Sequence, residues 1–171
     1  MGAITVLSPV AAAAAVGVGD VARLDGLTGR SVAIVGNGWR SWAALREPIR
    51  AALVDEHGVT GVELFDVPLG EPAPEEVLRD VAKADAAVVG LANCGSCAVA
   101  TARNARWLAD NGVAVLVAAT QRYAGMVASL AGELPLVNLP ADLEQFDDGR
   151  LATLAAELPR QIATHLGGRA R

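Results

Sequence analysis

From residue 31 onward, short runs rich in β-branched residues alternate with longer stretches of helical periodicity. The predicted strands cover residues 31–36, 59–65, 86–92, 113–119 and 134–139. The predicted helices cover residues 41–56, 74–83, 96–110, 121–131 and 149–165. This alternation is typical of a parallel sheet with helices packed on it. We therefore expect an α/β domain with a single doubly wound, mostly parallel sheet of about five strands and helices on both faces, flavodoxin-like or Rossmann-like.

The length of 171 residues fits one domain, which we place at residues 31–171. Residues 1–30 are rich in alanine and glycine and do not continue the alternation. We interpret them as an N-terminal arm or wrapping loop with a strand at residues 4–7. The apolar stretch at residues 9–19 is preceded by no Lys or Arg and is shorter than the roughly 20 residues that span a bilayer, so it is expected to be neither a signal peptide nor a membrane anchor.

Composition narrows the class of protein further. Hydrophobic residues make up 53% of the chain and charged residues 19%, and the formal net charge is −5. These values exclude intrinsic disorder and argue against a basic nucleic-acid-binding protein. We expect a cytoplasmic protein with no nucleic-acid or membrane partner, and the apolar arm favours a homo-oligomer.

The two cysteines of the chain stand three positions apart, as Cys94 and Cys97, between a predicted buried strand and a predicted helix. Unpaired N–H groups and the positive end of the helix dipole favour a thiolate there. Gly95 keeps the turn open, and Ser96 can cap the helix or hydrogen-bond a sulfur. We predict Cys94 as the nucleophile and Cys97 as the resolving or acid/base thiol. The alternative is a pair of small apolar residues at a strand-helix junction.

Both histidines are predicted to lie away from the cysteines. His57 ends a helix that returns to the amino edge of the sheet, and His165 ends the last helix. A Cys-His dyad is therefore not expected within one subunit. Structural zinc needs four Cys or His ligands, so we expect no metal site, and no cofactor is predicted.

Other polar residues follow the predicted strands at the carboxyl edge, where ligands bind in open parallel sheets. The loop at residues 36–41 resembles the first part of a dinucleotide-binding fingerprint, with Ser41 in place of the last glycine. We favour a different role, in which the loop's backbone amides, Arg40 and Ser41 hold an anionic group of a substrate. A tight turn with Trp39 and Trp42 packed on the sheet is the alternative. The predicted substrate-binding or orienting residues are Asn37, Gly38, Arg40, Ser41, Asp66, Asn93, Gly95, Ser96 and Thr120.

Several segments carry a family resemblance, at residues 7–9, 27–38, 84–90, 93–97, 104–105 and 111–113. The sequence Cys94-Gly95-Ser96-Cys97 after a buried strand resembles the UGSC-motif (seleno)protein family, and the similarity extends over roughly residues 7–123. A more distant likeness is to the selenoprotein B subunits of glycine, sarcosine and betaine reductases. The resemblance implies that Cys94 stands at the selenocysteine position and attacks, with Cys97 as its partner.

The chain departs from this family at three positions. Asn93 and Ala98 replace the family's Asp and Thr beside the motif, and Asn104 replaces a later Asp. Loss of negative charge eases thiolate formation, but it also removes candidate general bases.

The leading interpretation is a thiol-dependent enzyme that acts on a small electrophilic or disulfide substrate, with a thiol reductant as a second partner. A second is a non-redox cysteine-nucleophile lyase or transferase, in which Asn37, Asn93 and Ser96 orient the substrate and Asp66 is an acid or base. The third is a ligand-binding module or a non-catalytic reductase subunit.

Overall fold

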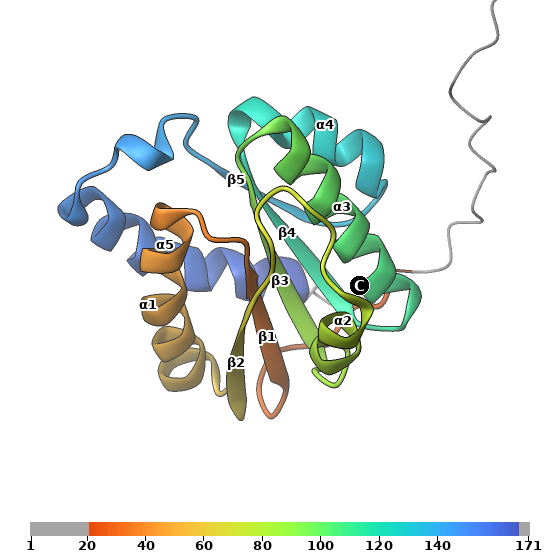
Figure 1. Cartoon of the computed structure of the whole chain (residues 1–171). Coiled ribbons are helices and arrows are strands. Elements are labelled where there is room, and N and C mark those ends of the chain that lie inside the picture. The colour runs from red at the N-terminus through yellow and green to blue at the C-terminus, as the bar shows by residue number, and fades with distance from the viewer. Residues whose placement is uncertain (1–20, 168–171) are drawn as a thin grey trace, which may run out of the picture.

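The computed structural model describes residues 21–167 (Figure 1). Within this range, strands and helices alternate along the chain as the sequence predicts. The elements are β1 (Ser31–Gly36), α1 (Arg40–His57), β2 (Gly61–Asp66), α2 (Glu75–Val81), β3 (Ala86–Ala92), α3 (Gly95–Asp110), β4 (Ala114–Thr120), α4 (Gln121–Ala131), β5 (Leu136–Leu139), the 3-10 helix η1 (Leu143–Gln145) and α5 (Asp148–Leu166). The predicted strand at residues 4–7, like most of the predicted arm, lies outside the described residues.

The five strands form one sheet in the order β2-β1-β3-β4-β5, and every pair of neighbours is parallel. The fold is therefore an α/β fold of the flavodoxin-like type. The predicted, mostly parallel sheet of about five strands is confirmed, and all of its strand pairs are parallel. The strand order reverses between β1 and β3. In open α/β sheets, ligands bind in the crevice beyond the strand ends at such a reversal.

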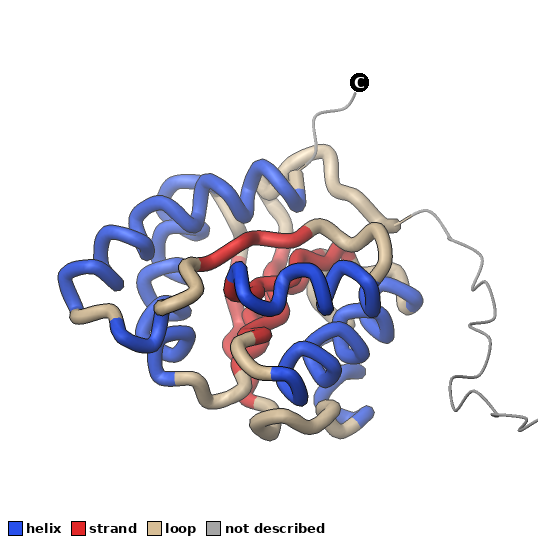
Figure 2. Tube along the Cα trace, turned by 90° about the horizontal axis from the view of Figure 1, so that it is seen from above, coloured by secondary structure: helices blue, strands red, loops and turns tan. Residues whose placement is uncertain are grey.

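Helices lie on both sides of the sheet (Figure 2). Two apolar clusters, one on each face, hold the layers together. Alternate residues of β1 point to opposite faces, so Val32 and Ile34 join the cluster covered by α1 and α5. Ala33 and Val35 join the cluster covered by α2, α3 and α4. The central strands β3 and β4 are buried along their whole length, as expected when helices cover both faces.

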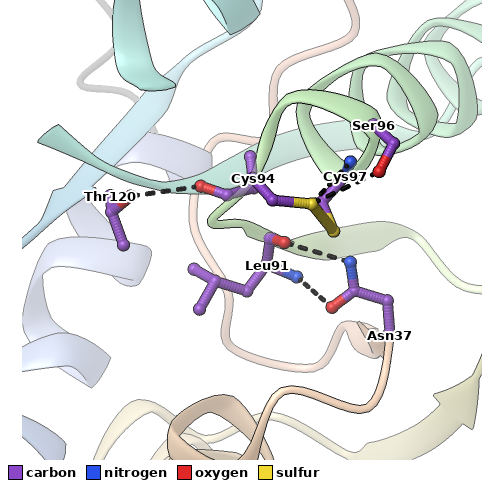
Figure 3. Close-up of a disulfide and its surroundings, with 7 residues drawn as sticks. Asn37, Leu91, Cys94, Ser96, Cys97 and Thr120 are labelled. Atoms are coloured by element: carbon purple, nitrogen blue, oxygen red, sulfur yellow. Dashed lines mark hydrogen bonds between the residues drawn. A yellow bond between two sulfur atoms is a disulfide. The ribbon is translucent and has the colours of Figure 1, made fainter. Parts of the chain in front are cut away.

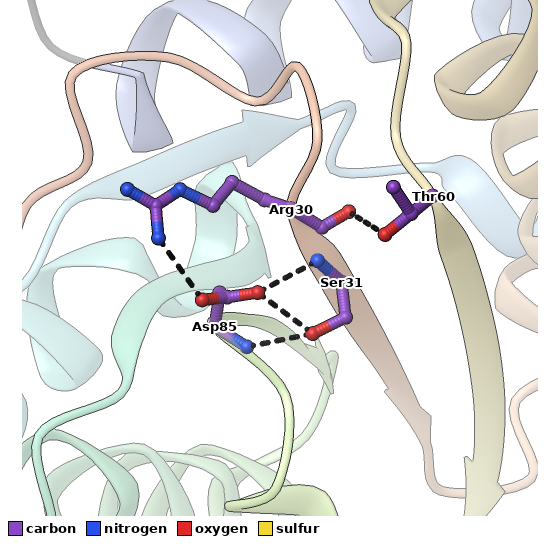
Figure 4. Close-up of polar contacts among 4 residues, drawn as sticks. All are labelled: Arg30, Ser31, Thr60 and Asp85. Carbon is purple, nitrogen blue, oxygen red and sulfur yellow. Dashed lines mark hydrogen bonds and ion pairs between the residues drawn. The ribbon is translucent and has the colours of Figure 1, made fainter.

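A polar cluster fixes the amino edge of the sheet (Figure 4). The Asp85 carboxylate, just before β3, accepts hydrogen bonds from Ser31 N at 2.8 Å and Ser31 Oγ at 2.8 Å, and it pairs with Arg30 at 3.2 Å. Thr60 Oγ1 donates to the carbonyl of Arg30 at 3.0 Å. The hydrogen bonds from Ser31, with the smaller contribution of Arg30, hold the pKa of Asp85 below its usual value. Both segments joined here, residues 29–31 and 84–86, belong to the stretches that carry the family resemblance.

The boundaries of the elements differ slightly from the predicted ones. β2 begins at Gly61 instead of residue 59, and just before its first Cα pair, with Ser31, Thr60 N donates to the Arg30 carbonyl at 2.9 Å. The described end of the predicted arm packs against the domain: Leu27 is buried, and Leu24 N donates to Leu166 O at 3.2 Å. Between residues 21 and 167, none of the helices is both long and apolar enough to cross a membrane.

Candidate functional site

The cysteine motif lies where β3 ends and α3 begins, as predicted. Cys94 is the N-cap residue of α3, with an extended backbone at φ −150° and ψ 171°. Its sulfur accepts a hydrogen bond from Cys97 N, at a nitrogen-to-sulfur distance of 3.2 Å. A side chain that accepts from this position satisfies one of the N–H groups left unpaired at a helix start. Both the hydrogen bond and the helix dipole favour negative charge on the Cys94 sulfur.

Cys94 and Cys97 are joined as a disulfide, and their Cα atoms are 5.1 Å apart. The two side chains differ in access to solvent, because Cys97 is fully buried against the sheet and Cys94 is half-buried. Ser96, between them, is exposed, and its hydroxyl lies 3.4 Å from the Cys94 sulfur. A reactant from solvent therefore meets Cys94 first.

The end of β3 is held from both flanks (Figure 3). On the β1 side, Asn37 Nδ2 donates to Leu91 O at 3.0 Å, and its Oδ1 accepts from Leu91 N at 2.8 Å. On the β4 side, the buried Thr120 hydroxyl donates to Ala92 O at 3.4 Å. Asn37 is 3% exposed. The predicted residues Asn37 and Thr120 thus lie beside the motif, and their side chains bind the main chain that leads into Cys94.

The Asn37 amide continues the pairing of β1 with β3. The last Cα partners of these strands are Val35 and Val89, after which β1 turns away at Gly38, with φ +84°. One carboxamide then serves both main-chain polar groups of Leu91. The Gly90–Leu91 peptide bond is cis.

The side chains predicted to hold an anionic substrate group, Arg40 and Ser41, both contact residues 144–146 of the chain itself. Ser41 N and Ser41 Oγ both donate to the side chain of Glu144, in η1. Arg40 donates to the carbonyls of Glu144 and Phe146 at 2.9 and 3.0 Å. Glu144 therefore binds the start of α1 where the anionic group was expected. The interpretation of Trp42 as a packing residue is confirmed, since it is buried and its Nε1 donates to Val35 O at 3.0 Å.

Asp66 ends β2 and is separated from β3 by β1. Its carboxylate is 2.7 Å from the guanidinium of Arg46, which also donates to Phe65 O at 3.0 Å. A Cβ on Gly36 would lie 2.6 Å from this guanidinium, so only glycine leaves room for it. The structure thus places Asp66 in an ion pair next to a different strand end from that of Cys94.

The structure groups the predicted residues in three places. Gly95 and Ser96 belong to the first turn of α3 with Cys97, and Asn93 stands just before Cys94. Asn37, Gly38 and Thr120 flank the end of β3, whereas Arg40, Ser41 and Asp66 are engaged elsewhere. Sequence reasoning missed Arg46 and Glu144, whose partners lie 20 and 103 residues away.

Sequence reasoning also missed two residues that fix the loop between β2 and α2. Asn104, noted only as a departure from the family pattern, accepts from Ala73 N at 3.0 Å. Gly70 lies against Ser96. The backbone of Gly70 has a positive φ of +75°, and the sequence pattern alone does not predict this conformation.

The histidines lie where predicted, His57 as the last residue of α1 and His165 in the last turn of α5. Among residues 21–167, no three His, Cys, Asp or Glu side chains gather closely enough to hold a metal ion.

Comparison with known proteins bears on the whole chain. Curated protein sequences gave no significant match. The model of the UGSC family, in contrast, matches residues 5–168, which include the cysteine motif, both flanks of β3 and the amino-edge cluster. The resemblance read from residues 7–123 therefore extends through β5 and α5, and the chain belongs to the UGSC family.

Proposed function

We propose that this protein is a thiol-dependent enzyme in which Cys94 attacks a small electrophilic or disulfide substrate and Cys97 resolves the covalent intermediate that forms on Cys94. The observation that carries the proposal is the asymmetry of the pair. Cys94 is half-buried at the N-terminus of α3, whereas Cys97 is fully buried one turn along, with 5.1 Å between the Cα atoms. An attacking sulfur that is more accessible than its partner suits a two-step thiol exchange, in which access to the first sulfur affects the rate.

With a disulfide substrate, the reaction takes two steps. The Cys94 thiolate attacks one substrate sulfur, a Cys94-to-substrate disulfide forms, and the other substrate half leaves with the electron pair and takes up a proton. The Cys97 thiolate then attacks Cys94 Sγ, which forms the intramolecular disulfide and releases the second half as a thiol. The substrate gains two electrons and two protons. A thiol reductant restores both cysteines and is itself oxidised to a disulfide.

The surroundings of Cys94 support the first step. Cys97 N and the Ser96 hydroxyl lie 3.2 and 3.4 Å from its sulfur, where both can stabilise a thiolate. The uncharged Asn93 and Ala98 on either side of the motif place no carboxylate next to it in sequence.

Alkylation of the reduced protein tests the proposal. We expect iodoacetamide to modify Cys94 with a pH midpoint below about 8, since a free thiol titrates near 8.5. Cys94→Ser should abolish this fast modification, and Cys97→Ser should retain it. If neither thiol titrates below about pH 8, the proposed chemistry is refuted.

Turnover distinguishes the proposed enzyme from the other two interpretations. The protein should accelerate the reduction of a small disulfide by dithiothreitol above the rate of direct exchange, and this acceleration should need both cysteines. Activity that survives Cys97→Ser and needs no reductant would favour a lyase or transferase, and ligand binding indifferent to both substitutions would favour a binding module or a reductase subunit. The expected homo-oligomer stays a prediction, which light scattering of the full chain tests.

A further inference from the structure

The loop between β2 and α2, residues 67–74, crosses the start of α3 beside the cysteine motif (Figure 1). Its closest approach is at Gly70. A Cβ placed on Gly70 would lie 2.8 Å from Ser96 Oγ and 3.4 Å from Ser96 Cβ. Real Cβ atoms essentially never make contacts under 3.0 Å, so the present position of the Ser96 hydroxyl is compatible with this loop only because residue 70 has no side chain.

Hydrogen bonds fix this loop on both sides of Gly70. Before it, Val67 N donates to the Gly36 carbonyl at 2.9 Å. After it, Ala73 N donates to Asn104 Oδ1 at 3.0 Å, and both residues are buried. The first contact ties the loop to the end of β1, and the second ties it to α3. The position of Gly70 over Ser96 is therefore set by the fold.

Ser96 is exposed, and a serine side chain has three staggered rotamers. In the rotamer present, its hydroxyl lies 3.4 Å from the Cys94 sulfur. A Cβ at residue 70 would meet the hydroxyl itself. The least costly relief is rotation of the Ser96 side chain, which takes the hydroxyl away from Cys94.

We propose that Gly70 is a positioning residue, which lets the loop close on Ser96 and hold its hydroxyl against the Cys94 sulfur. This inference rests on the proposed function, in which the Cys94 thiolate attacks. Ser96 acts on the reacting atom by donating a hydrogen bond to the thiolate, and Gly70 acts only through Ser96. Asn104 supports the same contact by anchoring the loop at Ala73.

The test uses reduced protein with Cys97→Ser as the common background, so that iodoacetamide reports on Cys94 alone. Gly70→Ala should raise the pH midpoint of alkylation by roughly half a unit to one unit, since loss of one hydrogen bond to a charged group has about this effect. Ser96→Ala should give the same shift. The double substitution should add nothing further, because the atom that Gly70→Ala displaces is already absent.

Gly29→Ala is the matched control. Gly29 has φ +76°, close to the +75° of Gly70, but a Cβ there meets nothing within 4 Å. Both substitutions place a side chain at a positive φ, so both should lower the melting temperature, and only Gly70→Ala should move the midpoint. Asn104→Ala provides a second route, since it frees the loop without placing an atom at residue 70, and it should raise the midpoint too.

The proposal is overturned if Gly70→Ala and Asn104→Ala leave the midpoint where Gly29→Ala leaves it, or if the Gly70→Ala and Ser96→Ala shifts add. The differences between variants test the role of Gly70. The midpoint of the parent protein tests the proposed function, so the two ideas fail separately.

Discussion

Replacing Asn37 with alanine should destabilise the protein more than any other single amide substitution at the carboxyl edge. The side chain is 3% exposed and makes two hydrogen bonds, to Leu91 N and Leu91 O, at 2.8 and 3.0 Å. Leu91 itself is fully buried. Asn37→Ala therefore leaves one buried donor, Leu91 N, and one buried acceptor, Leu91 O, without a hydrogen-bond partner, each at a cost of about 1–3 kcal/mol. We expect the free energy of unfolding to fall by about 2–6 kcal/mol, the low end applying if a water molecule enters the space.

Urea unfolding followed by circular dichroism measures this change, provided that the m-value is the same in both proteins. Asn111→Ala is the control, because it removes the same atoms from an exposed amide with one side-chain hydrogen bond, to Trp107 O at 2.7 Å. That variant should lose about 1 kcal/mol or less. If Asn37→Ala lowers the free energy of unfolding no more than Asn111→Ala does, the Asn37 amide does not stabilise the end of β3 and the prediction is refuted.

Substitutions at Asp85, Glu144 and Cys97 test three further contacts of the protein. Asp85→Asn should lower stability at pH 7 by about 1 kcal/mol or less, because the carboxylate is partly exposed. Since hydrogen bonds from Ser31 lower the pKa of Asp85 in the folded state, this stability is present above the unfolded pKa and is lost as the pH falls below about 4. Urea titrations at pH 7 and pH 3 should thus show the gap between variant and parent closing, and a constant gap would contradict this. Glu144→Gln should cost about 0.5–1 kcal/mol by removing negative charge from the start of α1, and added salt should shrink the difference. With Cys97→Ser and a small disulfide, mass spectrometry should show a mixed disulfide accumulating on Cys94, and an unmodified protein after turnover would exclude Cys97 as the resolving thiol.

Local periodicity carries most of what the sequence predicts. The alternation of buried runs and helical stretches identifies all five strands and the helices α1 to α5, because each pattern is complete within about ten to twenty residues. The position of Cys94 follows in the same way. An apolar run ends at Ala92 and a helix starts at Gly95, so Cys94, the residue directly before the helix, stands at a helix N-terminus.

Contacts between distant segments do not have such a signature. Glu144 lies in a stretch without helical or strand periodicity, and nothing near it in sequence indicates that it binds Ser41. The contact of Gly70 with Ser96 depends on the course of a whole loop. Asn37 was correctly placed at the carboxyl edge, yet its partner Leu91 is 54 residues away. Residue type and edge can be predicted, whereas the orientation of a side chain depends on tertiary packing.

The contacts of α1 with the last part of the chain also set the order in which the protein can be completed during synthesis. The apolar side chains Leu45, Ile49 and Leu53 of α1 share one buried cluster with α5, and Arg40 binds the carbonyl of a residue 104 positions later. Until the ribosome has released η1 and α5, one face of β1 and β3 has only α1 over it. The cysteine motif is translated well before that point. A nascent chain therefore carries both thiols before the face opposite α3 is closed, and the first and last units of the fold must meet for the domain to become stable.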